Sequence, residues 1–245
     1  MRLQVFLSRN GVSSRREALG LVQRGSVEVN GEVVDEPSYE VDPKKDRVMC
    51  KGIVIEPNPY KYILLNKPKN VTTAKHDPHA KSTVYELLPK NLQFVVPVGR
   101  LDRDTEGLIL LTNDGDVANC FTHPSFKIEK TYYVGMEGNL DSESKKKLEE
   151  GIYLDGKKTA PCKIQILRKY KNITEARITL HEGRNRQVRR MFGKVKYRVK
   201  FIQRTAQGPL KLGASRPGSW RELTKDEVEQ LKQLVEKSRQ HDNVK

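Results

Sequence analysis

The chain has 245 residues, with 46 Lys and Arg against 31 Asp and Glu and a formal net charge of +15. This length suits one substantial core plus a smaller module, and the positive charge is expected to attract polyanions such as phosphate backbones. A basic protein of a cell surface or of an anionic membrane is the alternative that the charge leaves open.

Membrane and secreted classes find no support in the sequence. No apolar run has the length needed to cross a bilayer, and the N-terminus lacks the apolar core of a signal peptide. Three cysteines at wide spacings suit reduced thiols better than a disulfide framework or a zinc site; they are Cys50, Cys120 and Cys162. We therefore expect a cytoplasmic protein without a membrane partner.

The N-terminal segment predicts two short helices. Leu3, Phe6 and Leu7 form an apolar stripe at helical spacing. Ser14 and Glu17 have the spacing of a capping box, in which each residue satisfies a backbone N–H of the other. A second helix is therefore expected to begin after Ser14.

A hairpin is expected after these helices. Val27 and Val29 alternate with polar residues ahead of Asn30-Gly31, a dipeptide that favours a tight turn. Several arginines surround the second helix, and a charge run of this kind is more often a solvated face than a binding site. They are Arg9, Arg15, Arg16 and Arg24.

A stiff polar connector, Glu56-Pro57-Asn58-Pro59, follows the N-terminal segment. We place a domain boundary there, between residues 1–58 and 59–245. Beyond it, residues 62–65 predict a strand that leads into Asn66-Lys67-Pro68. His76 and His79, in the next polar loop, lack a matching ligand cluster, so we interpret them as surface residues.

A densely charged loop lies between two apolar runs, residues 94–98 and 108–111, which have the length and branching of buried strands. Binding and catalytic groups concentrate in loops that rigid strands hold in place. We take Asp102 as the functional centre, although an Asp between two arginines is by itself more often a solvated turn. Asp102, Asp104 and Glu106 are also candidate ligands of a hard metal such as Mg²⁺.

The remaining patterns predict both helices and strands. Strands are expected at 128–134, 176–180 and 197–201, and helices at 114–120 and 141–151. Two further helices are expected to begin near Asn185 and after a capping box at Thr224 and Glu227. Within residues 128–134, alternation places Lys130 and Tyr132 on one face and Tyr133 on the other. A core tyrosine is the ordinary explanation for either ring. In the helix from Asn185, Arg186 and Arg189 project to the same side.

Several motifs resemble those of RNA pseudouridine synthases. The run G-R-L-D at 99–102, followed by D-T-E-G-L at 104–108, is similar to the catalytic-aspartate motif of that family. Asn66-Lys67-Pro68 resembles the first short motif of the family, which implies structural support beneath the active-site loop. The K-x-Y spacing at 130–132 and G-R-N-R-Q-V-R-R-M at 183–191 are similar to two further motifs, and residues 217–224 resemble its closing element. S-R-R-E-A with the later G-x-V-x-V-N-G resembles an S4 RNA-binding domain over roughly the first fifty residues.

The resemblance implies isomerisation of uridine to pseudouridine in RNA, with no cofactor and no metal. Asp102 would be the nucleophile, and Tyr132 would stack on the target base. Arg189 would pair with Asp102 and keep it ionised. Whether the carboxylate attacks the anomeric carbon, attacks the base ring or assists a glycal route stays open.

The resemblance also implies contacts between basic side chains and RNA, which give affinity rather than sequence choice. Arg100 or Arg103 would fill the space that an extruded uridine vacates. Ile202 stands where the family has a leucine and would supply an apolar wall, while Gln203 and Gln207 depart from the family pattern. The expected RNA-binding residues are Arg15, Arg16, Arg100, Arg103, Lys130, Arg184 and Arg186.

We expect an α+β protein with a small N-terminal S4-like RNA-binding domain and a larger catalytic domain, built on a mixed, mainly antiparallel sheet with flanking helices. The motifs are most similar to the branch that acts on large-subunit ribosomal RNA, although small-subunit rRNA and tRNA stay open. The expected partner is ribosomal RNA or an assembling large subunit, bound by a monomer, with no DNA partner.

Two other classes of function remain as alternatives. A noncatalytic S4-type ribosome-binding factor would grip rRNA and form no pseudouridine. A metal-dependent nuclease would use Asp102, Asp104 and Glu106 to cut RNA, and a chelator would abolish that cleavage.

Overall fold

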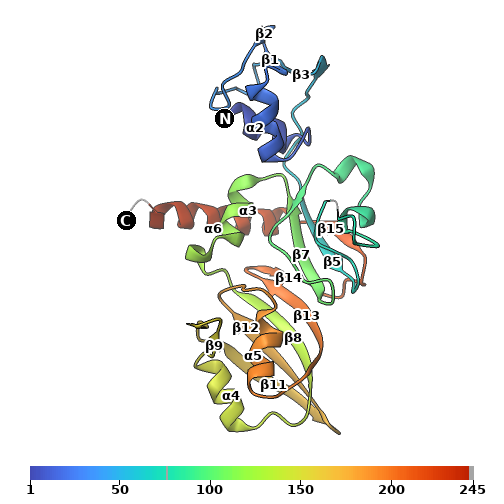
Figure 1. Cartoon of the computed structure of the whole chain (residues 1–245), viewed down its shortest axis with the longest axis vertical. Helices are drawn as coiled ribbons and strands as arrows, with labels where there is room; N and C mark the ends of the chain where they lie inside the picture. Colours follow the sequence, from blue (N-terminus) through green and yellow to red (C-terminus); the bar gives the residue numbers. More distant parts are fainter. Residues whose placement is uncertain (76, 243–245) are drawn as a thin grey trace.

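The structure is a computed structural model that describes residues 1–75 and 77–242 and shows two units (Figure 1). A small N-terminal unit stands at one end of the molecule, and a large sheet with flanking helices forms its body. This arrangement confirms the expected α+β fold. His76, which we interpreted as a surface residue, lies outside the described residues.

The N-terminal unit packs helices against a small antiparallel sheet of order β2-β1-β3-β4 with its own apolar core. Its elements are α1 Leu3–Arg9, α2 Arg15–Gln23, β1 Val27–Val29, β2 Glu32–Val33, β3 Val48–Cys50 and β4 Ile53–Val54. The predicted capping box begins α2, because Ser14 and Glu17 each accept a hydrogen bond from the other's backbone N–H. Asn30 and Gly31 both have positive φ, which confirms the hairpin turn.

The connector between the units is fixed to the end of α1. The backbone N–H of Asn58 donates to Asn10 Oδ1 at 2.7 Å, and its side-chain amide donates to the Asn10 carbonyl at 3.2 Å. The guanidinium of Arg9 lies 3.9 Å from the centre of the Tyr60 ring. Polar and cation–π contacts therefore hold the two units together at this point.

The main sheet has nine strands in the order β11-β12-β8-β13-β7-β5-β15, with β14 beside β13 and β6 beside β7. Only the pairing of β13 with β7 is parallel, so the sheet is mixed and mainly antiparallel, as expected. Its strands are β5 Tyr62–Lys67, β6 Val96–Pro97, β7 Glu106–Thr112, β8 Lys130–Glu137, β11 Lys163–Tyr170, β12 Ile173–Leu180, β13 Val199–Gln207, β14 Leu210–Lys211 and β15 Trp220–Glu222.

Helices cover the two ends of the sheet (Figure 1). Helices α4 and α5 contribute side chains to a core with β8, β11 and β12, while α3 and α6 join a core with β5 and β7. Their bounds are α3 Gly115–Thr122, α4 Ser142–Glu149, α5 Gln187–Lys194 and α6 Lys225–Asp242. A short hairpin is formed by β9 Tyr153–Leu154 and β10 Lys157–Lys158. The 3₁₀ turns are η1 Val84–Leu87, η2 Lys90–Leu92 and η3 Pro124–Phe126. The predicted capping box at Thr224 and Glu227 begins α6.

The prediction of a buried strand over residues 94–98 is wrong. Only Val96 and Pro97 pair with β7, and Val96 is 44% exposed. Val95 and Val98 are buried, but in different cores. The apolar run therefore reflects a segment that serves two cores and not a long ladder.

No helix in the described part of the chain is long and apolar enough to span a membrane. The three cysteines are free. Burial, followed by the charge of Glu149, raises the pKa of Cys162 to about 12. A thiol with so high a pKa is unreactive at neutral pH, because little thiolate is present.

The two halves of the main sheet meet where Gly107 of β7 pairs with Arg204 of β13. Gly107 has φ +109°, and a Cβ at this position would lie 2.3 Å from the backbone oxygen of Arg204. Only glycine fits, because any side chain would collide with the neighbouring strand. The end of the charged loop is thereby set against β13.

Replacing Gly107 by alanine is expected to destabilise the protein by at least about 2 kcal/mol, because the new methyl group meets backbone that cannot move alone. Gly218→Ala is the matched control: its φ is +86° but no atom lies within 4 Å of the added Cβ, so a loss of about 1 kcal/mol is expected. Urea unfolding followed by circular dichroism measures both changes. Equal losses in the two variants would contradict the close approach of β7 and β13.

Candidate active site

A cavity of about 1000 Å³ opens between the charged loop, β8, β13 and the start of α5. Every residue of the larger unit that we proposed from sequence as a catalytic, RNA-binding or wall residue lines this cavity: Arg100, Asp102, Arg103, Lys130, Tyr132, Arg184, Arg186, Arg189 and Ile202. These residues come from segments that are far apart in the chain. The fold therefore brings the separate motifs to one place.

Asp102 lies half-buried in the loop that precedes β7. The backbone N–H of Thr105 donates to the Asp102 carbonyl at 3.0 Å and closes a turn. On the other side, Asn70 donates to the Arg103 carbonyl at 2.8 Å, and Thr73 Oγ1 donates to the Leu101 carbonyl at 3.1 Å. The backbone on both sides of Asp102 is thus anchored, while its side chain faces the cavity.

Lys67 supports the loop from below. This side chain is fully buried, and its Nζ donates to the carbonyls of Pro68 at 2.9 Å, Val71 at 2.8 Å and Arg103 at 3.4 Å. Burial lowers the pKa of Lys67 to about 8, against the attraction of nearby carboxylates that include Asp102. These contacts agree with a supporting role beneath the active-site loop.

Our expectation that Arg189 pairs with Asp102 is corrected by the structure. Arg189 Nη2 lies 3.2 Å from Asp104 Oδ2 and donates to the Asp104 carbonyl at 3.1 Å. Arg186 donates to both carboxylate oxygens of Asp104, at 3.0 and 3.2 Å. No ion pair within the described residues involves Asp102. Sequence spacing could not tell which of the two carboxylates, Asp102 or Asp104, faces Arg189. A turn has no regular period that fixes the direction of each side chain.

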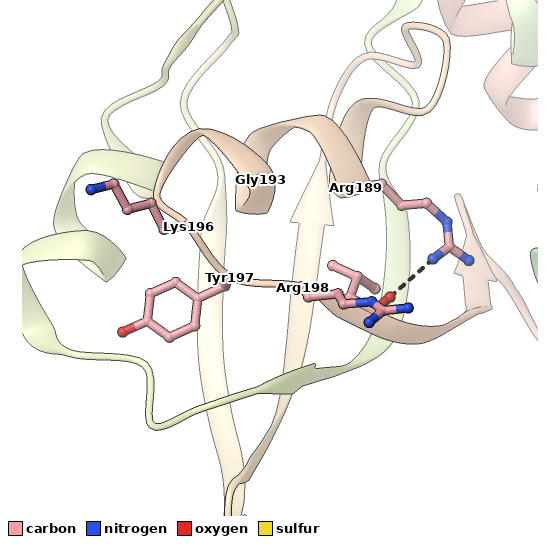
Figure 2. Close-up of a pocket in the computed structure, with 6 residues that line it drawn as sticks. Arg189, Gly193, Lys196, Tyr197 and Arg198 are labelled. Atoms are coloured by element: carbon pink, nitrogen blue, oxygen red, sulfur yellow. Dashed lines mark hydrogen bonds between the residues drawn. The ribbon is translucent and has the colours of Figure 1, made fainter.

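Arg189 lines a second, smaller hollow of about 440 Å³ as well (Figure 2). Its Nη1 donates to the Val199 carbonyl at 3.2 Å, at the start of β13. Lys196 and Arg198 add positive charge to the rim of this hollow. Arg189 therefore braces the loop, α5 and β13 with one side chain.

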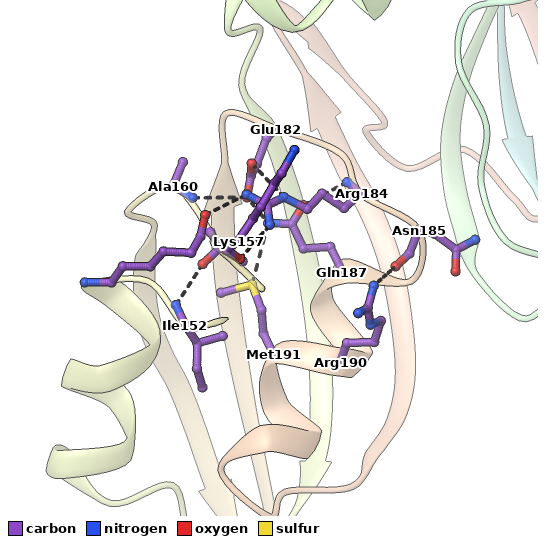
Figure 3. A network of polar contacts seen from close by, with 11 residues as sticks. Ile152, Lys157, Ala160, Glu182, Arg184, Asn185, Gln187, Arg190 and Met191 are labelled. Atoms are coloured by element: carbon purple, nitrogen blue, oxygen red, sulfur yellow. Dashed lines mark hydrogen bonds and ion pairs between the residues drawn. The ribbon is translucent and has the colours of Figure 1, made fainter. Parts of the chain in front are cut away.

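Arg184 has a structural task that the sequence did not reveal (Figure 3). Its guanidinium donates to the carbonyls of Lys157 at 2.9 Å and Lys158 at 2.7 Å, and its Nε donates to Glu182 at 3.2 Å. Gln187 joins the same network by donating to Glu182 at 2.6 Å. Arg184 thus holds the β9–β10 hairpin against the start of α5, and all of its guanidinium nitrogens are engaged. The geometry does not support its expected role as an RNA contact.

Four of the other expected RNA contacts are exposed to solvent, whereas Lys130 is half-buried and Arg186 is paired with Asp104. Arg103 is exposed, and both it and Arg100 lie on the lining of the cavity. Arg15 and Arg16 are exposed on α2 of the N-terminal unit. Exposed cations near a cavity and on a separate module suit phosphate contacts.

Two buried cations were missed as site residues in the sequence analysis. Lys67 is one of them, and Arg204 of β13 is the other, with only 2% of its surface exposed. Arg204 pairs across the strands with Tyr132 and donates from Nε to the Leu108 carbonyl at 2.7 Å. Lys67 stands in the motif Asn66-Lys67-Pro68 and Arg204 stands where the family has an arginine, but the sequence did not show that either side chain is buried beside the loop or the cavity.

Two of the three carboxylates proposed as metal ligands pair with different cations. Asp104 is held by two arginines, and Glu106 lies 3.7 Å from Lys69 Nζ. Within residues 1–75 and 77–242, no group of three or more His, Cys, Asp or Glu is placed to hold a metal ion. The residues present therefore do not form the ligand set that the nuclease alternative requires.

A basic cavity that presents a carboxylate and a tyrosine, in a chain with a separate basic module, is the arrangement expected of an enzyme that acts on RNA. Residues 61–194 match the family model of RNA pseudouridylate synthases, and residues 1–48 match that of the S4 domain. The chain belongs to the RNA pseudouridylate synthase family.

Similar proteins support this assignment over nearly the full chain. An uncharacterized RNA pseudouridine synthase of Aquifex aeolicus is 42% identical and covers 96% of this chain and 95% of its own length. The ribosomal large subunit pseudouridine synthase B of Bacillus subtilis is 41% identical, with 96% and 97% covered. A crystal structure of a pseudouridylate synthase has a TM-score of 0.68 at 31% identity and covers 94% of this chain and 99% of its own.

The pairing of Asp104 predicts a dependence of stability on pH. Burial acts to raise the pKa of Asp104, but the hydrogen bond from Arg186 and the charges of Arg189 and Arg186 outweigh it, so the pKa lies below its usual value of 3.8. A carboxyl whose pKa is lowered by folding stabilises the protein above its unfolded pKa and loses this effect as the pH falls through the folded value. Wild type is therefore expected to be more stable than Asp104→Asn at pH 7, and the gap is expected to close below about pH 4.

Chemical unfolding of both proteins between pH 7 and pH 2.5 measures this gap. Asp35→Asn is the control, because Asp35 is exposed in the N-terminal unit and its replacement is expected to leave stability nearly unchanged throughout. A gap of the same size at all pH values would show that Asp104 does not act through its charge.

Proposed function

We propose that this RNA pseudouridine synthase modifies a uridine of large-subunit ribosomal RNA, with Asp102 as the nucleophile, Tyr132 against the target base and Arg189 as the residue that positions the loop. The observation that carries the proposal is the presence of Asp102 and Tyr132 in one cavity surrounded by cations. The choice of large-subunit RNA rests on the 41% identity to the Bacillus subtilis enzyme.

The reaction explains why a carboxylate is needed. The bond from ribose C1′ to N1 of the base must break, and a new bond from C1′ to C5 must form. A carboxylate can attack and later leave, so it divides this change into two easier steps. The possible routes differ in the atom that Asp102 approaches, and each of them requires an ionised carboxylate that faces the nucleoside.

The surroundings of Asp102 provide preorganisation. Lys67 donates a hydrogen bond to the Arg103 carbonyl of the loop. Arg186 and Arg189 pair with the carboxylate of Asp104 in the same loop. A loop fixed in this way presents Asp102 without a cost of reordering during the reaction. The pairing of Arg189 with Asp104 supports a positioning role for this arginine, acting through the loop rather than through direct contact with Asp102.

Two groups of arginines are proposed to bind the RNA. Arg15 and Arg16 of the N-terminal unit bind phosphates away from the cavity. Arg100 and Arg103 at the cavity fill the space that the extruded uridine leaves. We further propose that the units divide as residues 1–58 and 59–245, and that the protein acts as a monomer in the cytoplasm.

The decisive experiment incubates a large-subunit rRNA transcript with the protein in the presence of a chelator. Pseudouridine is then mapped by carbodiimide-dependent stops of reverse transcription. We expect a new pseudouridine at one site in RNA of unchanged length. Strand cleavage that the chelator prevents would favour a nuclease, and bound RNA without pseudouridine would favour a noncatalytic binding factor.

Asp102→Asn is expected to reduce pseudouridine formation by at least about 10⁴-fold, since the amide is a poor nucleophile. RNA affinity is expected to stay close to that of wild type, because a single uncharged replacement removes no phosphate contact. Asp226→Asn, at an exposed position in the first turn of α6, is the control and should retain full activity. Near-normal turnover of Asp102→Asn would remove Asp102 from the nucleophile role.

Replacing Arg15 and Arg16 together by glutamine is expected to weaken RNA binding and to reduce the slope of log affinity against log salt by about 1.5, as two phosphate contacts are lost. Turnover at saturating RNA should stay unchanged. The control replaces Lys44 and Lys45, which are exposed elsewhere in the same unit. The same loss of affinity and slope in both double variants would indicate general attraction by charge and no specific surface on α2.

A further inference from the structure

The wall of the cavity beside Tyr132 is built from two antiparallel strands, β8 and β13. Their register pairs Tyr132 with Arg204 and Lys130 with Gln207. A register shift between Arg204 and Ala206 marks a bulge in β13. This bulge turns Gln207, and not Ala206, to the face that carries Arg204. Lys130, Arg204 and Gln207 all line the cavity, and we term these three residues the polar wall.

Two members of the polar wall are almost completely buried and incompletely hydrogen-bonded. Arg204 is 2% exposed; its Nε donates to the Leu108 carbonyl and its guanidinium interacts with the Tyr132 side chain, but its Nη2 has no partner. Gln207 is 1% exposed, and its Oε1 has no partner. Buried polar groups without partners are rare because each costs free energy. An unpaired donor and an unpaired acceptor, buried in two residues of one cavity wall, point to a ligand that satisfies both.

The polar wall also holds two cations and no carboxylate. Lys130 donates to the Ile128 carbonyl at 3.1 Å, and neither Lys130 nor Arg204 takes part in an ion pair across residues 1–75 and 77–242. Burial, followed by the charge of Arg204, lowers the pKa of Lys130. A buried and a half-buried cation without counter-ions favour a partner that carries or develops negative charge.

We propose that the polar wall holds the uracil base after it has left the ribose and keeps it in the cavity until it reattaches through carbon. This inference rests on the proposed function. When the bond from C1′ to N1 breaks, its electron pair leaves with the base, and negative charge spreads from N1 onto O2 and O4. On reattachment the bond from C1′ to C5 forms, C5 gives up its proton and N1 gains one, so the composition of the base is unchanged.

The hydrogen-bonding pattern of the polar wall fits uracil better than a phosphate. The edge of uracil presents O2, N3–H and O4, which are two acceptors on either side of a donor. Lys130 and Arg204 supply donors to the oxygens, and the Gln207 carbonyl accepts from N3–H. A phosphate offers only acceptors and would leave the Gln207 carbonyl unpaired.

The same contacts strengthen as the reaction proceeds. In the bound uridine, O2 and O4 carry only partial charge, whereas the detached base carries a full negative charge. Donors that meet this charge in a cavity with little water stabilise the transition state more than the ground state. The polar wall therefore both promotes departure of the base and prevents its loss to solvent.

The test uses Lys130→Met and Gln207→Leu, which remove a cation and an acceptor at nearly constant size. RNA that carries labelled uracil at the modified site reports pseudouridine, free uracil and abasic sites, while a filter assay reports RNA affinity. We expect turnover at saturating RNA to fall at least about tenfold, with affinity within about twofold of wild type. Free uracil and abasic RNA are expected from both variants and not from wild type.

Matched controls are Lys163→Met and Gln165→Leu, because both residues are exposed on β11 and neither lines the cavity. Thermal melting verifies that the variants fold, and Lys130→Arg, which keeps the cation, should retain the base. Weakened RNA binding with normal turnover at saturation would instead assign the polar wall to a phosphate and overturn the proposal. A wild-type protein that forms no pseudouridine overturns the proposed function together with this inference, whereas an active wild type beside variants that release no uracil overturns the inference alone.

Discussion

The grip of Arg186 and Arg189 on the carboxylate of Asp104 is the contact on which the site depends. It joins the charged loop to α5 across 82 residues of sequence, and so it connects two segments whose apolar residues pack in different cores. Ion pairs, and not apolar packing, fix the loop at this point, because the other side of the loop must stay accessible to a ligand. Both arginines pair with Asp104, and Asp102 forms no ion pair within the described residues.

A surplus of cations surrounds this loop at every level. Lys67 lies below it, Arg100 and Arg103 line the cavity, and Arg204 is buried in the wall beside Tyr132. The cation below is fully bonded to backbone carbonyls and serves the fold. Arg100, Arg103 and Arg204, which line the cavity, form no ion pair within residues 1–75 and 77–242, and they suit a polyanion and a base that becomes negative as it leaves. The excess positive charge therefore has two uses: Lys67 supports the loop, and the cations that line the cavity suit RNA binding and the reaction.

Local features of this fold were predictable from sequence. The capping boxes at Ser14 and Thr224 and the turn at Asn30 depend on residues within a few positions of each other, and the structure confirms them. The face shared by Lys130 and Tyr132 followed from strand alternation, and both line the cavity. Resemblance to a known family supplied the fold class and the reaction, which periodicity alone did not provide.

Features that depend on distant contacts could not be derived in this way. The partner of Arg189 is set by the direction of a turn, and the task of Arg184 depends on a hairpin nearly thirty positions earlier in the chain. Val95 and Val98 are buried in two different cores, and the segment does not form the long strand that its composition suggested. The role of Gln207 follows only from a bulge in β13, which turns one side chain to the other face of the sheet.

A crystal structure of the protein with a stem-loop of its rRNA target, containing the mapped uridine, is the most direct test of the account. The account predicts that this nucleoside is extruded from the RNA, with its ribose facing Asp102, its ring against Tyr132 and the edge of its base toward Gln207. A cavity occupied only by phosphates, with the uridine still stacked in the RNA, would contradict it.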